Sequence, residues 1–144
     1  MKFWDSSAVI PLIIEETASI ELRACHGRDR EMLVWWGTLL ECHSAIARRE
    51  RAGMLPAAVR SQASRALREL SDYWIEVEPV ASIREAAVRL VRIHDLRAAD
   101  ALQLAAAVLV RPEGSGAMEF VCLDRRLAAA ASKEGMAVVD GSAE

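Results

Sequence analysis

Short apolar runs alternate along the chain with longer amphipathic segments. Five of the short runs are rich in β-branched or aromatic residues, as strands are. They occupy residues 3–4, 33–36, 73–77, 120–123 and 137–139. The segments between them carry apolar residues at every third or fourth position, which is the spacing of an amphipathic helix. Strands that alternate with helices predict one α/β domain over residues 1–144, in which helices flank both faces of a central, mainly parallel five-stranded sheet.

Local signals mark the ends of several predicted helices. The segments Thr38-Leu39-Leu40-Glu41 and Ser82-Ile83-Arg84-Glu85 have the form of a capping box, in which the first and fourth side chains bond free backbone N–H groups. Gly53 and Gly135 each follow a helical segment, and glycine is strongly favoured just beyond the end of a helix. We therefore expect helices to begin at the two boxes and to end before the two glycines.

The composition is that of a folded globular domain, with 53% apolar and 27% charged residues. A formal charge of −3 argues against a generally basic nucleic-acid coat protein. Sixteen of the eighteen basic residues are arginine, whose planar guanidinium suits bidentate contacts to phosphate or carboxylate. The basic residues are therefore compatible with a polyanionic substrate or an acidic partner.

The cysteines and the hydropathy of the chain indicate the compartment in which the protein acts. Cys25, Cys42 and Cys122 include no close pair, so neither a disulfide framework nor a CxxC metal or redox site is predicted. The longest apolar stretches, at 9–14 and 104–110, are far shorter than the roughly 20 residues that span a bilayer. The first residues also lack the pattern of a signal peptide. We expect a cytoplasmic protein that makes no use of a membrane.

Four acidic residues fall where a parallel sheet binds its ligands. In a doubly wound sheet this place is the edge formed by the carboxyl ends of the strands. Asp5 and Asp124 directly follow the first and fourth predicted strands, and Glu41 lies one turn into the helix after the second. Asp100 opens the apolar helix at 101–107. We therefore expect the four carboxylates to meet at one edge of the sheet.

Each acid taken alone has an ordinary structural explanation. Asp5 and Asp124 suit helix N-caps, and Asp100 suits a first helical turn, where the dipole favours an acid. Glu41 suits the capping box that Thr38 begins. As a set, however, the acids would repel one another by about 4 kcal/mol per pair, for a separation of about 4 Å and an effective dielectric constant near 20. A cation is needed to hold them together. Because no matching set of histidines or cysteines exists, oxygen ligands indicate Mg²⁺ or Mn²⁺, which can promote phosphodiester hydrolysis.

Four segments make the chain recognisable. They are Asp5-Ser6-Ser7-Ala8-Val9-Ile10, Thr38-Leu39-Leu40-Glu41, Leu96-Arg97-Ala98-Ala99-Asp100-Ala101-Leu102-Gln103-Leu104-Ala105 and Phe120-Val121-Cys122-Leu123-Asp124-Arg125-Arg126-Leu127. In their order and spacing they resemble the PIN-domain ribonucleases, and most closely the VapC-type toxins of bacterial and archaeal toxin–antitoxin pairs. The resemblance implies a PIN-like fold. It also implies that Asp5, Glu41 and Asp100 bind the catalytic divalent ion, with Asp124 as the more variable fourth acid.

Further residues are interpreted from the same resemblance. Ser6 or Ser7 matches a hydroxyl position that steadies the site, whereas Cys122 stands where the family often has Thr or Ser. A thiol is a weak hydrogen-bond donor, so Cys122 departs from the pattern. Arg97 and Arg125 flank two of the proposed ligands, and together with Ser6 they are expected to contact the substrate.

The resemblance also implies an activity and partners. The activity is that of an endoribonuclease that depends on Mg²⁺ or Mn²⁺ and hydrolyses RNA phosphodiesters with a metal-activated water. Such a protein is the toxin of a type II toxin–antitoxin system, binds a small antitoxin and commonly forms a homodimer. In VapC-like proteins the early helical region, here residues 9–22, helps to form the cleft that the antitoxin occupies.

Two alternative functions stay open. A PIN fold without catalysis would act only as an interaction module, and it would be recognised by a failure to bind divalent cations. A structure-specific DNA nuclease would be recognised by cleaving DNA rather than RNA. The histidines have no spacing that predicts a general base, and all four tryptophans fall in predicted strands, where aromatic side chains are expected to fill the core.

Overall fold

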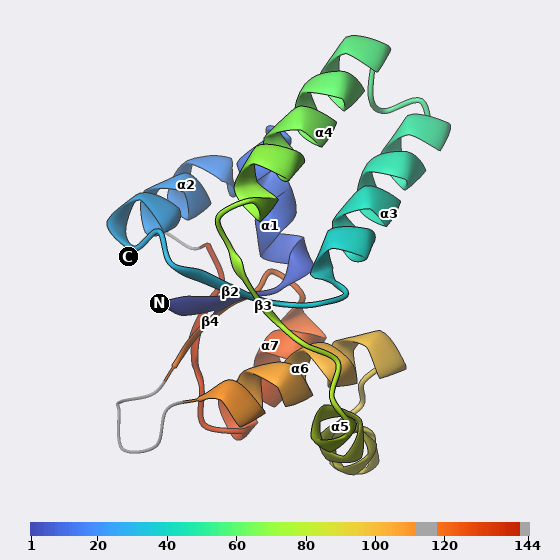
Figure 1. Cartoon of the computed structure of the whole chain (residues 1–144). Helices are drawn as coiled ribbons and strands as arrows, with labels where there is room; N and C mark the ends of the chain where they lie inside the picture. Colours follow the sequence, from blue (N-terminus) through green and yellow to red (C-terminus); the bar gives the residue numbers. More distant parts are fainter. Residues whose placement is uncertain (112–117, 142–144) are drawn as a thin grey trace.

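The computed structural model describes residues 1–111 and 118–141, and it has the α/β architecture that the sequence predicts (Figure 1). Its five strands form one sheet in the order β3-β2-β1-β4-β5, and every pair of neighbouring strands is parallel. The strands are β1 (Lys2–Trp4), β2 (Met32–Trp35), β3 (Ile75–Val77), β4 (Glu119–Val121) and β5 (Ala137–Val139). The sheet is thus wholly rather than mainly parallel over the described residues.

Helices cover both faces of the sheet, as expected. One face carries α1 (Ser6–Ile13), α2 (Ser19–Arg28), α3 (Thr38–Arg51) and α4 (Ala57–Ser71). The other carries α5 (Ala81–Ile93), α6 (Ala98–Val110) and α7 (Arg125–Lys133) (Figure 1). None of the helices in the described part of the chain has the length and apolar character needed to cross a membrane.

The strand order brings two distant strand ends together. The chain moves outward from β1 to β2 and β3, and then returns to the other side of β1 to form β4 and β5. Phe3 of the central strand is therefore in register with Leu33 on one side and with Phe120 on the other. The direction of winding reverses beside β1, and ligands of open α/β sheets bind at the carboxyl ends of the strands at this position.

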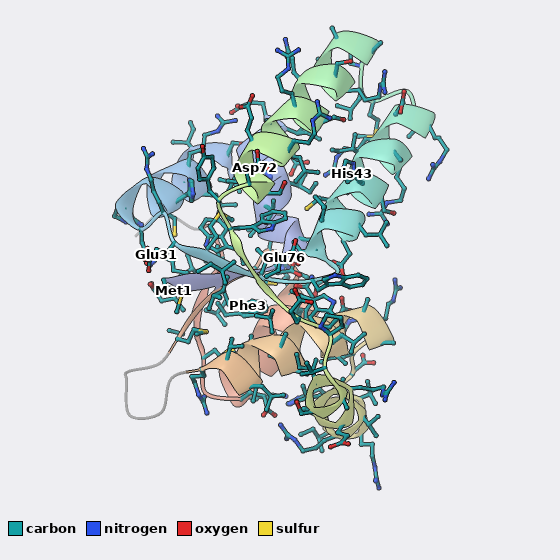
Figure 2. The ribbon with its side chains drawn as sticks, viewed as in Figure 1. Met1, Phe3, Glu31, His43, Asp72 and Glu76 are labelled. Carbon is teal, nitrogen blue, oxygen red and sulfur yellow. The ribbon has the colours of Figure 1, made fainter. Side chains whose placement is uncertain are left out.

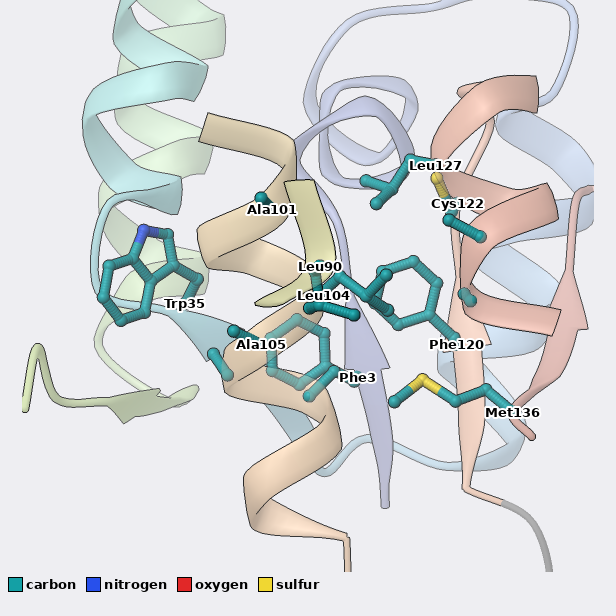
Figure 3. Close-up of a cluster of buried hydrophobic side chains, with 14 of the residues drawn as sticks. Phe3, Trp35, Leu90, Ala101, Leu104, Ala105, Phe120, Cys122, Leu127 and Met136 are labelled. Carbon is teal, nitrogen blue, oxygen red and sulfur yellow. The ribbon is translucent and has the colours of Figure 1, made fainter. Parts of the chain in front are cut away.

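Two apolar cores hold the helices against the sheet. In the core beneath α5, α6 and α7, the rings of Phe3 and Phe120 stack with their centroids 5.5 Å apart, beside Leu104 and Leu127 (Figure 3). The core on the opposite face is centred on Trp4, which is fully buried. Successive residues of β1 thus contribute to opposite cores, which fixes the position of the residue that follows them.

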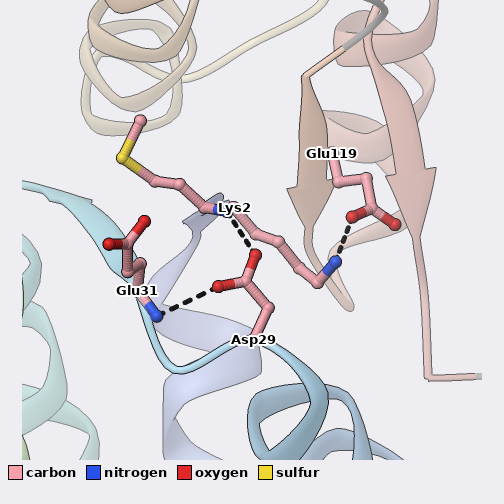
Figure 4. A network of polar contacts seen from close by, with 5 residues as sticks. Lys2, Asp29, Glu31 and Glu119 are labelled. Atoms are coloured by element: carbon pink, nitrogen blue, oxygen red, sulfur yellow. Dashed lines mark hydrogen bonds and ion pairs between the residues drawn. The ribbon is translucent and has the colours of Figure 1, made fainter.

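Polar contacts tie the strands together at the end of the sheet opposite to the carboxyl ends (Figure 4). Lys2 forms an ion pair with Glu119, which links β1 to β4, and the N-terminal ammonium pairs with Asp29. The backbone N–H of Glu31 donates to Asp29 Oδ1 at 3.2 Å. These partly exposed pairs support the strand register more than they add to stability.

The second strand begins and ends one residue earlier than predicted, and the third begins two residues later, so three aromatic residues, Trp36, Tyr73 and Trp74, lie outside them. Trp36 is 52% exposed and Tyr73 is 86% exposed, so the prediction that every tryptophan fills the core is wrong for Trp36. Strand β2 ends because Gly37 packs against the indole of Trp35, where a Cβ would lie 2.7 Å from Nε1. The chain must turn there, and Trp36 points away from the core.

Both predicted capping boxes are wrong, whereas both glycine stops are confirmed. Helix α3 has Gly37 as its N-cap, with no side-chain cap, and Thr38 is its first residue. Helix α5 starts one residue before Ser82. Gly53 and Gly135 follow α3 and α7 with φ angles of 71° and 85°, a conformation that glycine adopts without strain.

Candidate active site

A cleft of about 690 Å³ opens at the carboxyl edge of the sheet. Glu41, Asp100 and Asp124 line it, and Asp5, only 4% exposed, is hydrogen-bonded to groups beside it. These acids come from four different elements of the chain. The strand order therefore brings the four acids predicted from the sequence to one region of the molecule.

Asp5 is held rigidly at the end of β1. Its backbone N–H donates to the carbonyl of Val121 at 3.0 Å, which continues the pairing of β1 with β4. Its side chain caps α1, because Oδ2 accepts the backbone N–H of Ser7 at 2.9 Å and also the Ser7 hydroxyl. Asp5 therefore has the N-cap role considered from the sequence. The other oxygen of its carboxylate, Oδ1, takes no part in the cap and accepts a hydrogen bond from Gln103.

The ends of β1 and β4 are joined through Ser7. Its hydroxyl oxygen accepts the backbone N–H of Leu123 at 2.9 Å while the hydroxyl donates to Asp5. Cys122 is fully buried and its thiol points at Asp5 Oδ2 from 3.6 Å. Burial raises the pKa of the Cys122 thiol, so it stays protonated and can only donate weakly to the carboxylate. The strong hydroxyl donor to Asp5 therefore comes from Ser7 rather than from position 122.

Glu41 is turned toward Asp5 by two donors. The Ser6 hydroxyl donates to Glu41 Oε2 at 2.7 Å, and the side-chain amide of Gln103 donates to the same oxygen at 2.8 Å. The amide also donates to Asp5 Oδ1 at 2.7 Å. One neutral side chain thus links two of the predicted acids. Sequence reasoning did not single out Gln103, although a polar residue one turn after Asp100 in an apolar helix was a usable signal.

The other two acids sit at helix starts. Asp100 lies in the first turn of α6 and is half-buried. Asp124 caps α7, with Oδ1 accepting the backbone N–H groups of Arg126 and Leu127 at 2.9 Å each. Both of these local roles were considered from the sequence, and both coexist with a place in the cleft. An acid at a helix N-terminus is stabilised by the dipole while its free oxygen can face a ligand.

Burial and mutual repulsion disfavour ionisation of three of the acids. Burial raises the pKa of Asp5 above its ordinary value, although hydrogen bonds from Ser7 oppose the change. Burial likewise raises the pKa of Glu41, and the charge of Asp5 adds to the effect. The pKa of Asp100 is raised by burial and by the charge of Asp124. Burial is thus the main cause of all three shifts, and the charges of neighbouring acids add to it.

We expect the metal-free protein to become more stable as the pH falls from 7 to 5. Asp5, Glu41 and Asp100 have raised pKa values in the folded state, so they bind protons at a pH where the unfolded chain is ionised, and stability falls as pH rises through this window. Glu134 and Asp29, whose pKa values are lowered, oppose this only below about pH 4. Burial lowers the pKa of His26, which opposes the trend within the window, but as one group against three. Melting temperatures in EDTA at pH 5, 6 and 7 test the prediction.

The control for this pH dependence is Asp100→Asn, which removes one of the three groups and should flatten the slope. A melting temperature that rises with pH in EDTA, or a slope that the substitution leaves unchanged, would contradict the assignment of the raised pKa values.

Arginines surround the acids. Among the described residues that line the cleft are Arg48, Arg49, Arg97 and Arg126, but not Arg125. Arg49 forms an ion pair with Glu16 at 2.5 Å, and Arg126 lies 3.9 Å from the exposed Asp95. The cleft therefore combines an acidic centre with cationic walls. Arg125 and Arg126 are adjacent on α7, and the rotation of this helix about its axis determines which of them faces the cleft.

Histidines take no part in this cleft within the described residues. His43 is exposed on α3 (Figure 2), and His26 packs edge-on against Trp4 with ring centroids 6.0 Å apart. His94 contacts Glu134 at 2.7 Å at the C-terminal end of α7, whereas Asp124 lies at its N-terminal end. General acid or base chemistry in the cleft would therefore use carboxyl groups or water rather than imidazole.

The donor set suits a hard divalent cation. Carboxylate oxygens dominate it, and Glu41 Oε1 accepts no hydrogen bond from the described residues. Across residues 1–111 and 118–141, however, no three His, Cys, Asp or Glu side chains are already gathered as a metal-binding group. Asp5 and Glu41 are instead bridged by the Gln103 amide.

Comparisons with known proteins give two curated relatives. Ribonuclease VapC45 and Ribonuclease VapC49, both of Mycobacterium tuberculosis, are each 32% identical to the chain over an alignment of 145 residues. The alignments cover 94% of this chain and 92% of the relative. No protein-family model matches the chain.

Two solved structures share the fold. PAE2754 from Pyrobaculum aerophilum superposes with a TM-score of 0.64 at 22% identity, covering 96% of this chain and 83% of that one. A chain of a toxin–antitoxin complex from Klebsiella pneumoniae superposes with a TM-score of 0.64 at 19% identity, with each chain covered completely. The architecture of the five parallel strands and their helices is therefore that of known proteins.

Proposed function

The chain belongs to the VapC family of PIN-domain ribonucleases, and from this premise we propose that it is a Mg²⁺- or Mn²⁺-dependent endoribonuclease that acts as the toxin of a toxin–antitoxin pair in the cytoplasm. The observation that carries the proposal is a cleft with arginine walls at the carboxyl edge of the sheet, which Glu41, Asp100 and Asp124 line and beside which Gln103 bonds both Asp5 and Glu41. An acidic centre suits a divalent cation that activates water, and arginines suit the phosphates of a nucleic acid.

Asp5, Glu41 and Asp100 would hold the cation, with Asp124 as a fourth acid at the rim of the same cleft. When bound, the ion supplies a Lewis acid that lowers the pKa of water and stabilises charge on a phosphate. The residues around the acids orient them: Ser7 fixes Asp5 and Ser6 fixes Glu41. These hydrogen bonds restrain the Asp5 and Glu41 side chains, which reduces the conformational freedom that binding an ion would cost.

The arginine walls suit the polyanionic substrate. Arg97 is exposed at the N-terminus of α6, beside Asp100, and Arg126 is exposed at the start of α7. Guanidinium groups in these places can grip the phosphates on either side of the scissile one, since arginine binds phosphate in a bidentate manner. We assign substrate contact to Ser6 and Arg97, as predicted from the sequence, and to Arg126 in place of Arg125.

A second hollow supports an antitoxin partner. Leu12, Ile13 and Leu70, with the exposed Tyr73, form the apolar part of a depression of about 320 Å³ among α1, α2 and α4, which Arg23 and Glu69 also line. The first of these helices belongs to the early region that the sequence associates with the antitoxin cleft. An apolar depression of this kind fits the apolar face of a partner helix. Homodimer formation stays a prediction from the resemblance.

The proposal is tested by measuring which nucleic acid the protein cleaves and which divalent ion the cleavage needs. Labelled single-stranded RNA and DNA of the same sequence are incubated with the protein in Mn²⁺, Mg²⁺ or EDTA. We expect RNA to be cut in Mn²⁺ and in Mg²⁺, and to stay intact in EDTA. Cleavage of DNA alone would favour the structure-specific DNA nuclease. Failure of the protein to bind Mn²⁺ at all would favour an interaction module without catalysis.

A further inference from the structure

Gln103 is a buried amide in an otherwise apolar helix. Its side chain is 1% exposed, and its neighbours on α6 include Leu104, Ala106 and Ala107, all of which are fully buried. An amide removed from water costs free energy unless hydrogen bonds replace those it made to the solvent. The partners of Gln103 therefore show what it does in the fold.

Both partners of the amide are acids of the candidate active site. Nε2 donates to Asp5 Oδ1 at 2.7 Å and to Glu41 Oε2 at 2.8 Å. Ionised carboxylates only accept, so the amide has to present its NH₂ group and not its oxygen. Gln103 Oε1 is buried and has no hydrogen-bond partner among the described residues. The two carboxylates alone therefore decide how this side chain is oriented.

Gln103 is distinguished from the other donors by touching both acids. Ser7 and Cys122 donate to Asp5, and Ser6 donates to Glu41, but each of these reaches a single carboxylate. The two N–H bonds of one amide diverge by about 120°, so they hold the two accepting oxygens roughly 5 Å apart. Without the amide, two half-desolvated carboxylates would face each other with no shared donor.

We propose that Gln103 is a positioning residue that fixes the carboxylates of Asp5 and Glu41 as a pair and thereby sets how tightly that pair binds a divalent cation. The inference rests on the proposed function and adds a residue to it. The amide bridges the two acids through Asp5 Oδ1 and Glu41 Oε2 and so restrains both side chains, while Glu41 Oε1 accepts no hydrogen bond from the described residues. Outer partners of this kind typically contribute a factor of 10–100 to metal affinity.

The test is a Mn²⁺ titration by calorimetry of the wild-type protein and of Gln103→Leu. Leucine has a volume close to that of glutamine and carries no donor. The matched control is Leu104→Met, which alters the next residue of the same helix in the core but contacts neither acid. We expect the dissociation constant of Gln103→Leu to be 10–100 times that of the wild type, and that of Leu104→Met to stay within a factor of two.

Melting temperatures in EDTA separate positioning from a purely structural role. If Gln103→Leu melts at a lower temperature but binds Mn²⁺ as tightly as the wild type, the proposal is overturned. If it does not fold, Gln103→Met, which keeps an unbranched side chain of similar length, takes its place under the same criterion. If the wild type itself binds no Mn²⁺, the proposed function fails together with the inference. If the wild type binds and the variant binds equally, only the inference fails.

Discussion

Replacing Asp100 with asparagine is expected to lower the rate of RNA cleavage by about a thousandfold while leaving the fold intact. The substitution removes one of the anionic ligands proposed for the cation. A loss of several kcal/mol of transition-state stabilisation corresponds to a factor of this size. Folding should not suffer, because burial and the charge of Asp124 raise the pKa of Asp100, so its ionised form opposes the metal-free folded state at neutral pH.

The measurement is the initial rate of cleavage of a labelled RNA in saturating Mn²⁺, with melting temperatures in EDTA as a check on folding. Asp72→Asn is the matched control. It makes the same chemical change at an exposed residue at the end of α4, outside the cleft (Figure 2). Asp72→Asn should cut RNA at the wild-type rate. Undiminished cleavage by Asp100→Asn would remove Asp100 from the site.

Replacing Phe120 with alanine is expected to reduce the free energy of unfolding by about 3–5 kcal/mol. Phe120 is fully buried, stacks on Phe3 of the neighbouring strand and lies in the core that α6 and α7 cover (Figure 3). Removing the ring leaves a cavity that two paired strands cannot close, because their backbones are held by the sheet. The loss is a large part of the stability of an ordinary domain.

Urea denaturation, followed by circular dichroism, measures this change. The control is Val88→Ala on α5, where the side chain is 57% exposed and little packing is lost, so a change within about 0.5 kcal/mol is expected. A loss below about 1 kcal/mol for Phe120→Ala would mean that the sheet does not pack against α6 and α7 as described.

The positions of Asp5 and Asp124 could be predicted from the sequence because each directly follows a predicted strand. In the structure Asp5 directly follows β1, whereas β4 ends at Val121, earlier than predicted, and Asp124 is the third residue after it. Only one piece of three-dimensional information is needed to bring them together, namely that β1 and β4 are neighbours. Parallel strands that alternate with helices place that neighbouring pair at the switch in winding. The local cap roles of both residues were also predictable, since a helix begins at the residue that follows each acid.

The role of Glu41 could not be decided locally. A capping box and a site ligand have the same sequence pattern, and the choice between them depends on where α3 begins. Gly37 takes the N-cap position because it packs against the indole of Trp35, which turns Glu41 toward Ser6 and Gln103. This tertiary contact has no signal in the four-residue box. It is the reason that the local prediction failed at this helix.

The prediction for Trp36 failed for a related reason. A run of apolar residues does not show which member is the last in the strand, and the turn at Gly37 places Trp36 outside the core. Gln103 was predictable in principle. It lies one turn from Asp100 on the inner face of α6, and a polar side chain on a buried face needs a partner.

The central claim is that Asp5, Glu41 and Asp100 converge on one divalent cation. It is tested most directly by growing crystals of the protein in Mn²⁺ and locating the ion from its anomalous scattering. The account predicts a manganese peak coordinated by carboxylate oxygens of all three residues. A fully loaded crystal in which manganese binds elsewhere, with these three carboxylates free of it, would contradict the claim.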